Sequence, residues 1–160
     1  MRILLLLRHA KSPHVEGVAD RDRPILPETR EQIARLAREL AAEHLAPDAV
    51  FTSDAARAVA TAKAYARAVS GPEPIPTPGL YEPGETDDIL AAVHACGEDC
   101  RTLLLVGHNP GFEEFCNRLT KQPLIARLET GALAAFVADI AAWSDLRFGE
   151  AALMGVWHSH

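Results

Sequence analysis

The strongest constraint on the fold of this chain is an apolar run near its start, Ile3-Leu4-Leu5-Leu6-Leu7, which ends at Arg8-His9. A run of roughly four to eight apolar residues that ends in polar ones is typical of a strand buried on both faces, as in a parallel sheet. Residues 102–106 repeat this pattern and are followed by Gly107 and His108. Ligands of open α/β sheets bind just beyond the carboxyl ends of the strands. We therefore expect His9 and His108 at one edge of a buried sheet.

The rest of the chain alternates between strand-like and helix-like patterns. Helices are predicted over residues 27–44, 55–69, 86–95 and 110–119, and further strands over 49–51, 133–138 and 151–156, with 74–76 as an edge strand. Ser53 or Asp54 is expected to cap the second helix, and Thr86 or Asp87 the third. This alternation predicts a single α/β domain over residues 1–160, with three layers, a mainly parallel central sheet, helices on both faces and a tail at 157–160.

Composition narrows the functional class. The chain has 160 residues, 48% of them hydrophobic, and a net charge of −6, which argues against nucleic acid as a partner. The leucine run is too short to be a signal-peptide core or to cross a membrane, so we expect a cytoplasmic protein with no membrane partner. The cysteines Cys96, Cys100 and Cys116 match no common zinc pattern and are interpreted as reduced thiols.

Arginines are expected to join the two histidines at the sheet edge. Arg57 falls in the first turn of its predicted helix, where a cation opposes the helix macrodipole and a bound anion would relieve that conflict. Arg23 lies in the polar loop 11–27, beside Pro24 and an apolar pair, and is interpreted as facing the site. Its neighbour Arg21 is interpreted as part of a solvated turn with local ion pairs.

These residue types are suited to phosphoryl transfer. A neutral imidazole is a good nucleophile near pH 7, and arginine grips phosphate in a planar, bidentate way. Phosphoryl transfer mainly requires positioning and neutralisation of charge on the equatorial oxygens. The sequence has neither the acidic cluster of a magnesium-dependent phosphatase nor a GxxxxGK[ST] loop. We therefore expect no metal and no cofactor.

Six blocks in order resemble the histidine phosphatase superfamily, which has the phosphoglycerate-mutase-like fold, and within it the short SixA-type phosphohistidine phosphatases. The blocks span nearly the whole chain: Leu6–Ser12, Asp22–Leu26, Ser53–Thr61, Leu80–Glu82, Val106–Pro110 and Thr130–Ala132. The chain departs from the branch at Pro27 and Thr29, where small polar residues and glycine are usual. That departure concerns the shape of the turn before the first helix.

The resemblance implies a role for each matched residue. His9 would be the nucleophile that becomes phosphorylated, with Arg8, Arg57 and His108 acting catalytically as ligands of the phosphoryl group. Arg23 and Asn109 would be further phosphate or substrate contacts. Glu82 is the nearest match to the acid of larger members, and Glu85 and His108 are alternatives for that role. No role is assigned to Lys11 or Ser12.

The substrate class is predicted from the short spans between the blocks, which leave little chain to form a lid. An open site suits phosphohistidine on a protein surface, and we expect a metal-independent protein phosphohistidine phosphatase. Hydrolysis of a small phosphomonoester is the alternative enzymatic function. A non-catalytic phosphate-binding module is a third interpretation, although both histidines and the core arginines are present.

Overall fold

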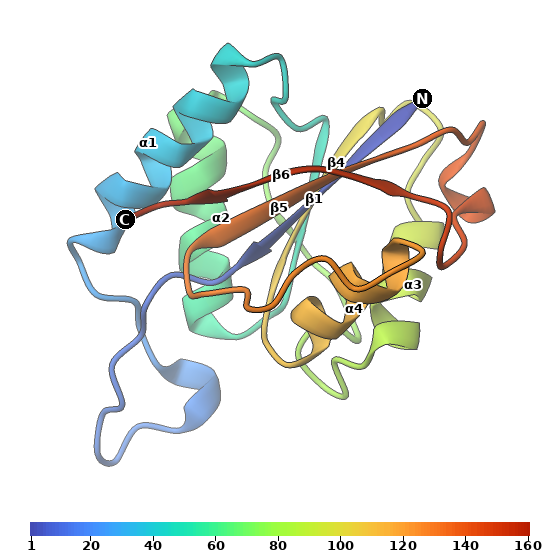
Figure 1. Ribbon diagram of the computed structural model, residues 1–160. Helices are drawn as coiled ribbons and strands as arrows, with labels where there is room; N and C mark the ends of the chain where they lie inside the picture. Colours follow the sequence, from blue (N-terminus) through green and yellow to red (C-terminus); the bar gives the residue numbers. More distant parts are fainter.

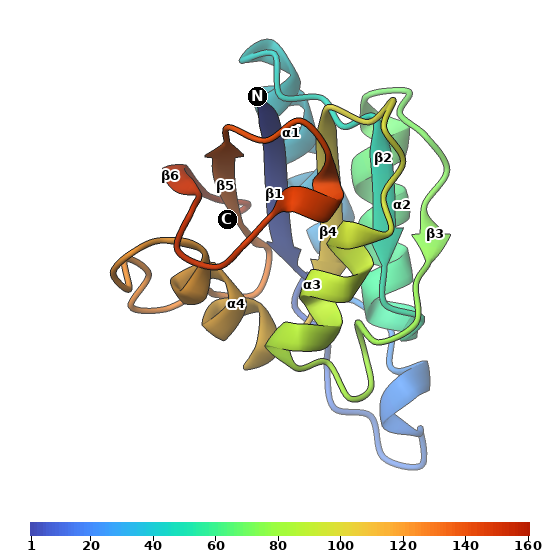
Figure 2. The ribbon, with the colours of Figure 1, turned by 90° about the vertical axis from the view of Figure 1, so that its right-hand side faces the viewer.

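The computed structural model describes residues 1–160 and has one six-stranded sheet between two layers of helices (Figures 1 and 2). The strands are β1 (Arg2–Arg8), β2 (Ala49–Thr52), β3 (Ile75–Pro76), β4 (Thr102–Gly107), β5 (Ala132–Ala138) and β6 (Ala152–His158). They lie in the order β3-β2-β4-β1-β5-β6. The first four in this order are parallel, and β5 and β6 run antiparallel to their neighbours. The predicted α/β fold with a mainly parallel sheet is confirmed.

The helices cover both faces of the sheet, as Figure 2 shows. On one face are α1 (Thr29–Ala42) and α2 (Ala56–Ala68), and on the other are α3 (Thr86–His94) and α4 (Gly111–Leu119). Two short 3-10 turns, η1 (Asp20–Asp22) and η2 (Trp143–Asp145), lie in connecting segments. None of the helices combines the length and the apolar character that a membrane-spanning helix requires.

Strand β1 supplies both halves of the core, because successive side chains of a strand point to opposite faces. Leu4 and Leu6 join the cluster under α3 and α4, whereas Leu5 and Leu7 join the cluster under α1 and α2. All four leucines are at most 3% exposed. This two-sided burial explains why β1 is an unbroken apolar run rather than an alternating one.

Strand β1 is paired along both edges. Leu6 is opposite Leu105 of β4 and Ala134 of β5, and the ladder continues past the strand because the His9 N–H donates to the Gly107 carbonyl at 3.0 Å. The strand therefore fixes the backbone of the residue that follows it.

Two helix caps differ from the sequence prediction. The N-cap position of α3 is Glu85, and the Asp88 side chain accepts the Glu85 N–H at 3.1 Å. The prediction of Thr86 or Asp87 was therefore wrong. Ahead of α2, the cap position is Ala55, and the Ser53 hydroxyl accepts the Ala55 N–H at 3.1 Å.

The predicted tail is also shorter than expected. Trp157 and His158 are the last two residues of β6, opposite Leu133 and Ala132 of β5. The side chains of β6 alternate between exposed and half-buried, as expected for an edge strand, although the apolar stretch 152–157 runs one residue past the predicted end of the strand at 156. Only Ser159 and His160 lie beyond it, and the Ser159 N–H still donates to the Gly131 carbonyl.

Candidate active site

Three adjacent strands deliver polar side chains to one edge of the sheet. His9 follows β1, Ser53 follows β2 and His108 follows β4, and these strands are parallel neighbours. The ring centroids of His9 and His108 are 5.1 Å apart. The expectation that the two histidines share one edge is therefore confirmed.

His9 is held in a defined tautomer by its own backbone. Its Nδ1 lies 2.8 Å from the Ala10 carbonyl oxygen, and the residue is only 7% exposed. Because a carbonyl oxygen can only accept a hydrogen bond, Nδ1 carries the proton and Nε2 keeps its lone pair. Burial lowers the pKa of His9 to about 4, and the positive charges of Arg57, Arg8 and Arg23 contribute to that shift. The ring is therefore neutral and nucleophilic at neutral pH.

Arg57 approaches His9 from the first turn of α2, as expected, and is 7% exposed. Arg8 lies at the end of β1, where one of its guanidinium nitrogens donates to the Leu128 carbonyl at 3.1 Å. Arg23 comes from the loop between β1 and α1, which projects from the body of the domain in Figure 1. Its guanidinium donates to the carbonyls of Pro13 and Ser12, so the loop itself orients this cation.

His108 contacts the Ser53 hydroxyl and the aromatic ring of Tyr81. Its Nε2 lies 2.6 Å from the Ser53 Oγ, and its ring is tilted against Tyr81 with centroids 5.1 Å apart. Its Nδ1 is buried without a partner. Burial lowers the pKa of His108 to about 3, and the charges of His9 and Arg57 contribute in the same direction. His108 is thus also neutral in the free protein.

The carboxylate of Asp20 is hydrogen-bonded to two of these arginines, Arg57 and Arg23. It accepts hydrogen bonds from Arg57 at 3.1 Å, from Arg23 at 2.9 Å and from the Tyr81 hydroxyl at 2.5 Å. These bonds, that of Tyr81 first, lower the pKa of Asp20 to about 2. The donors around Asp20 could also donate hydrogen bonds to a phosphoryl group.

Residues 4–95 match the family model described as the histidine phosphatase superfamily (branch 1). The chain belongs to the histidine phosphatase superfamily. An uncharacterized protein of Mycobacterium tuberculosis is 34% identical over 111 residues, covering 65% of this chain and 63% of that protein. The alignment therefore leaves more than a third of the relative's length unmatched.

Solved structures of superfamily members share the fold over nearly the whole chain. A protein of Nakamurella multipartitia, named as a SixA phosphohistidine phosphatase, is 29% identical with a TM-score of 0.83, covering 98% of this chain and 95% of that one. The protein histidine phosphatase SixA in complex with tungstate has a TM-score of 0.81 at 18% identity, covering 98% and 97%. The resemblance to this superfamily is confirmed.

Three residues expected at the site, Glu82, Glu85 and Asn109, form no hydrogen bond with the histidines or arginines of the cluster. Glu82 is exposed and lines a cavity of about 350 Å³ that also includes Tyr81. Glu85 is occupied as the α3 cap. The side chain of Asn109 bonds to Glu113 and to the Leu128 carbonyl, so it joins the start of α4 to a loop.

Sequence reasoning missed three residues of the cluster. The sequence predicts no site role for Asp20 or Tyr81, and it predicts Ser53 only as a possible helix cap. Their contacts span 37 to 61 positions in the sequence, and local patterns carry no signal for such pairs. Arg21 lies at the exposed surface, as expected, but its ion pair is with Asp54, 33 positions away, and not with a neighbour in the turn. No three histidine, cysteine or carboxylate side chains are grouped closely enough to hold a metal ion.

Proposed function

We propose that this protein is a metal-independent phosphatase that acts through a phosphorylated His9 and that its substrate is phosphohistidine on a protein. The observation that carries the proposal is the His9 Nδ1 contact with the Ala10 carbonyl, which leaves the Nε2 lone pair free beside three arginines. Membership of the superfamily supports the same reaction class.

The proposed reaction has two displacements. In the first, Nε2 of His9 attacks phosphorus, a P–N bond forms to His9, and the bond from phosphorus to the leaving group breaks. In the second, water attacks the phosphorylated His9, inorganic phosphate leaves, and the electron pair returns to Nε2. Arg8, Arg57 and a protonated His108 would balance the charge on the phosphoryl oxygens, with Arg23 as an outer contact. The incoming dianion would favour the protonated form of His108, because an opposite charge stabilises a cation.

The proton donors available at the cluster favour phosphohistidine over an alkyl phosphate ester as the substrate. An alkoxide leaving group needs a proton donor, whereas the ring of phosphohistidine has a second nitrogen that takes a proton from water near neutral pH. The carboxyl closest to the arginines, Asp20, has a pKa of about 2 and is ionised at neutral pH. Glu82 is exposed, and Glu85 is engaged at α3. We propose that Glu82 supplies a proton only when the substrate is an ester.

The covalent intermediate can be tested by labelling. A histidine-containing protein phosphorylated with [32P]phosphoramidate is mixed with the chain in EDTA, quenched in base to preserve phosphoramidate, and digested for mapping. Label on the peptide that contains His9, absent in His9→Ala, is the expected result. Turnover that survives in His9→Ala would refute the proposal.

The substrate class needs a second measurement. Rates on the phosphohistidine protein are compared with rates on p-nitrophenyl phosphate and a panel of sugar and nucleoside monophosphates. A higher kcat/KM for phosphohistidine is expected. The reverse ranking would favour a small phosphomonoesterase, and phosphate binding without label or turnover would favour a non-catalytic module.

A further inference from the structure

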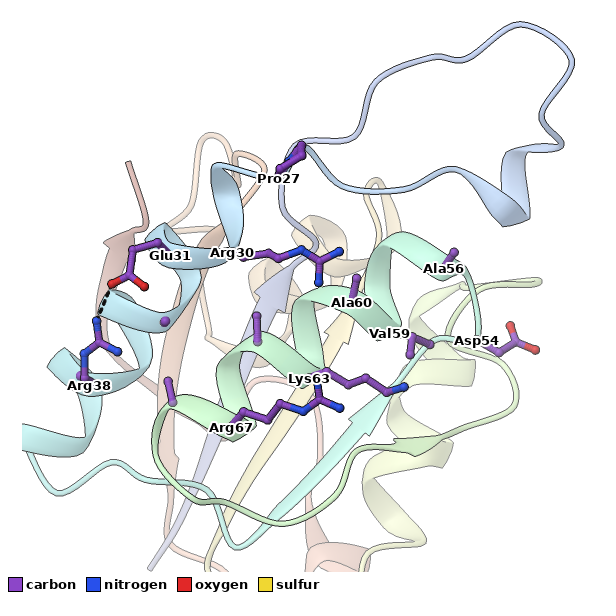
Figure 3. A pocket seen from close by; sticks show the side chains of 13 residues that line it. Pro27, Arg30, Glu31, Arg38, Asp54, Ala56, Val59, Ala60, Lys63 and Arg67 are labelled. Carbon is purple, nitrogen blue, oxygen red and sulfur yellow. Dashed lines mark hydrogen bonds and ion pairs between the residues drawn. The ribbon is translucent and has the colours of Figure 1, made fainter.

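A second surface of the molecule carries unmatched positive charge. A groove of about 1000 Å³ runs between α1 and α2 on the side away from the sheet (Figure 3). Its floor is formed by small side chains at five positions, Ala34, Ala56, Ala60, Ala64 and Ala68. Because these side chains end at Cβ, a ligand can approach both helix backbones closely.

The rim of the groove holds cations without carboxylate partners. Its two acidic residues are already engaged, since Glu31 pairs with Arg38 at 2.7 Å and Asp54 pairs with Arg21. Arg30, Lys63 and Arg67 form no ion pair, and Figure 3 shows their side chains along the groove. This local excess of positive charge lies in a chain whose net charge is −6.

The groove leads towards the candidate active site. Pro27 and Asp54 line its end at the starts of the two helices, and α2 begins there with Ala56 on the groove and Arg57 at the site. From Ala56 to Ala68 the groove extends about 18 Å along α2, which corresponds to about three turns of a bound helix. A partner lying in the groove would have one end at the start of α2, beside Arg57.

We propose that the α1–α2 groove is a docking surface for an acidic helix of the phosphorylated protein substrate. This inference rests on the proposed function and adds a binding surface outside the catalytic cluster. The alanine floor suits the apolar side of such a helix, and the three free cations suit carboxylates along its edge. Nucleic acid fits less well, because DNA carries about one charge per 1.7 Å and the net charge of the chain repels it.

The binding test uses a defined probe rather than a natural partner. A fluorescein-labelled alanine-rich helical peptide of about four turns, with glutamates along one edge, is titrated with the full chain and followed by anisotropy. A second peptide has glutamine at every glutamate position. We expect the acidic peptide to bind about tenfold more tightly than the glutamine peptide and to lose this advantage in high salt.

Matched variants then locate the binding. The double variant Lys63→Glu, Arg67→Glu should weaken binding of the acidic peptide about tenfold or more. The control Arg35→Glu, Arg101→Glu changes net charge equally at exposed positions outside the groove and should change binding less than about twofold. Lys63→Gln, Arg67→Gln repeats the test with smaller disturbance of α2. Hydrolysis of p-nitrophenyl phosphate should be unchanged in all three, which separates docking from catalysis.

Several results would overturn the inference. Equal binding of the two peptides, or equal loss in the control variant, would show that the groove is not a specific surface. Tighter binding of a DNA oligonucleotide, lost in the groove variant, would assign the groove to nucleic acid. A dimer that only the groove variant dissociates would assign it to a second copy of the chain. A chain that binds the acidic peptide but gives no label on His9 would retain the docking surface and lose the proposed reaction.

Discussion

The Asp20 carboxylate lies 3.1 Å from the Arg57 guanidinium, so that an anion of the protein itself occupies one of the cations nearest His9. Asp20 belongs to the projecting loop, whereas Arg57 is buried in the first turn of α2. An incoming phosphoryl group would share or replace this contact. The strength of phosphate binding therefore depends on how readily a half-exposed carboxylate gives up its partners.

Substitution of Asp20 tests this competition. Asp20→Asn removes the negative charge from Arg57 and Arg23, and we expect inorganic phosphate to bind about threefold more tightly, since exposed ion pairs are weak. The dissociation constant is measured by calorimetry. Asp22→Asn, in the same turn and without a bond to the arginines, serves as the control. Weaker phosphate binding in Asp20→Asn would contradict competition.

The pH dependence of kcat/KM tests the state of His9. Protonation removes the Nε2 lone pair, and the pKa of His9 is lowered to about 4 by burial. We therefore expect the acid limb of kcat/KM, where activity is lost as the pH falls, to have its midpoint near 4 rather than near the ordinary value of about 6.5. Ionisation of the substrate is followed separately by 31P NMR. An acid limb centred near the ordinary value would show that His9 is not desolvated.

Ser53 is expected to act by positioning His108. Its hydroxyl contacts His108 Nε2 at 2.6 Å and accepts the Ala55 N–H, so Ser53→Ala leaves two polar groups without a partner. We expect kcat to fall about tenfold and the free energy of unfolding to fall by about 1–3 kcal/mol. Both are measured against Ser144→Ala, an exposed serine far along the chain. An unchanged kcat with reduced stability would limit Ser53 to the helix start.

Gly131 supports the backbone of His9, the proposed nucleophile. Its N–H donates to the carbonyls of both Arg8 and His9 at 3.0 Å, its φ is 72°, and an added Cβ would collide with the Ser159 hydroxyl. Gly131→Ala should lower the free energy of unfolding by about 1–3 kcal/mol in urea titrations. Gly17→Ala is the matched control, since its φ is 79° but nothing lies within 4 Å of an added Cβ. Equal losses in the two variants would mean that backbone conformation alone accounts for the effect.

Substitutions of Glu82 and of Glu85 distinguish a role in acid catalysis from a role at the start of α3. Glu82→Gln should lower turnover of an alkyl phosphate ester about tenfold but change phosphohistidine turnover less than about twofold, because only the ester needs a proton donor. Glu85→Gln should instead change neither rate, since Glu85 lies at the N-cap position of α3 and its bond there is donated by its backbone N–H to Asp88. A large loss of phosphohistidine turnover in Glu82→Gln would contradict the proposed difference between the substrates.

The parts of the fold that could be predicted are those with a strong local signal. Strands β1 and β4 are apolar on both faces, and α2 buries Ala58, Ala62 and Ala66 at helical spacing. A continuous apolar run and an apolar stripe at helical spacing can both be recognised in a single sequence. The full extent of β6 could not be predicted, because Trp157 and His158 join the strand through pairing with Leu133 and Ala132 of β5, and this distant pairing has no local signal.

The candidate site divides in the same way. His9, His108 and Arg57 are set by strand ends and a helix start, and their convergence follows from parallel strands. Asp20 and Tyr81 reach the cluster from separate connecting segments, and their bond joins positions 61 residues apart. Such a contact depends on how two loops fold over the sheet, which spacing along the chain does not encode.

Strand β1 is hydrogen-bonded on both sides, and its side chains are divided between two cores. Displacing β1 by one position would exchange the two sets of leucines and move His9 out of line with His108. Such a shift would disturb both cores and both strand pairings and is therefore strongly unfavourable. The projecting loop with Asp20 and Arg23 has no comparable constraint. Changes in substrate preference can therefore accumulate in that loop while Nε2 of His9, the proposed attacking nitrogen, keeps its position, and the chemistry and its choice of target are free to evolve at different rates.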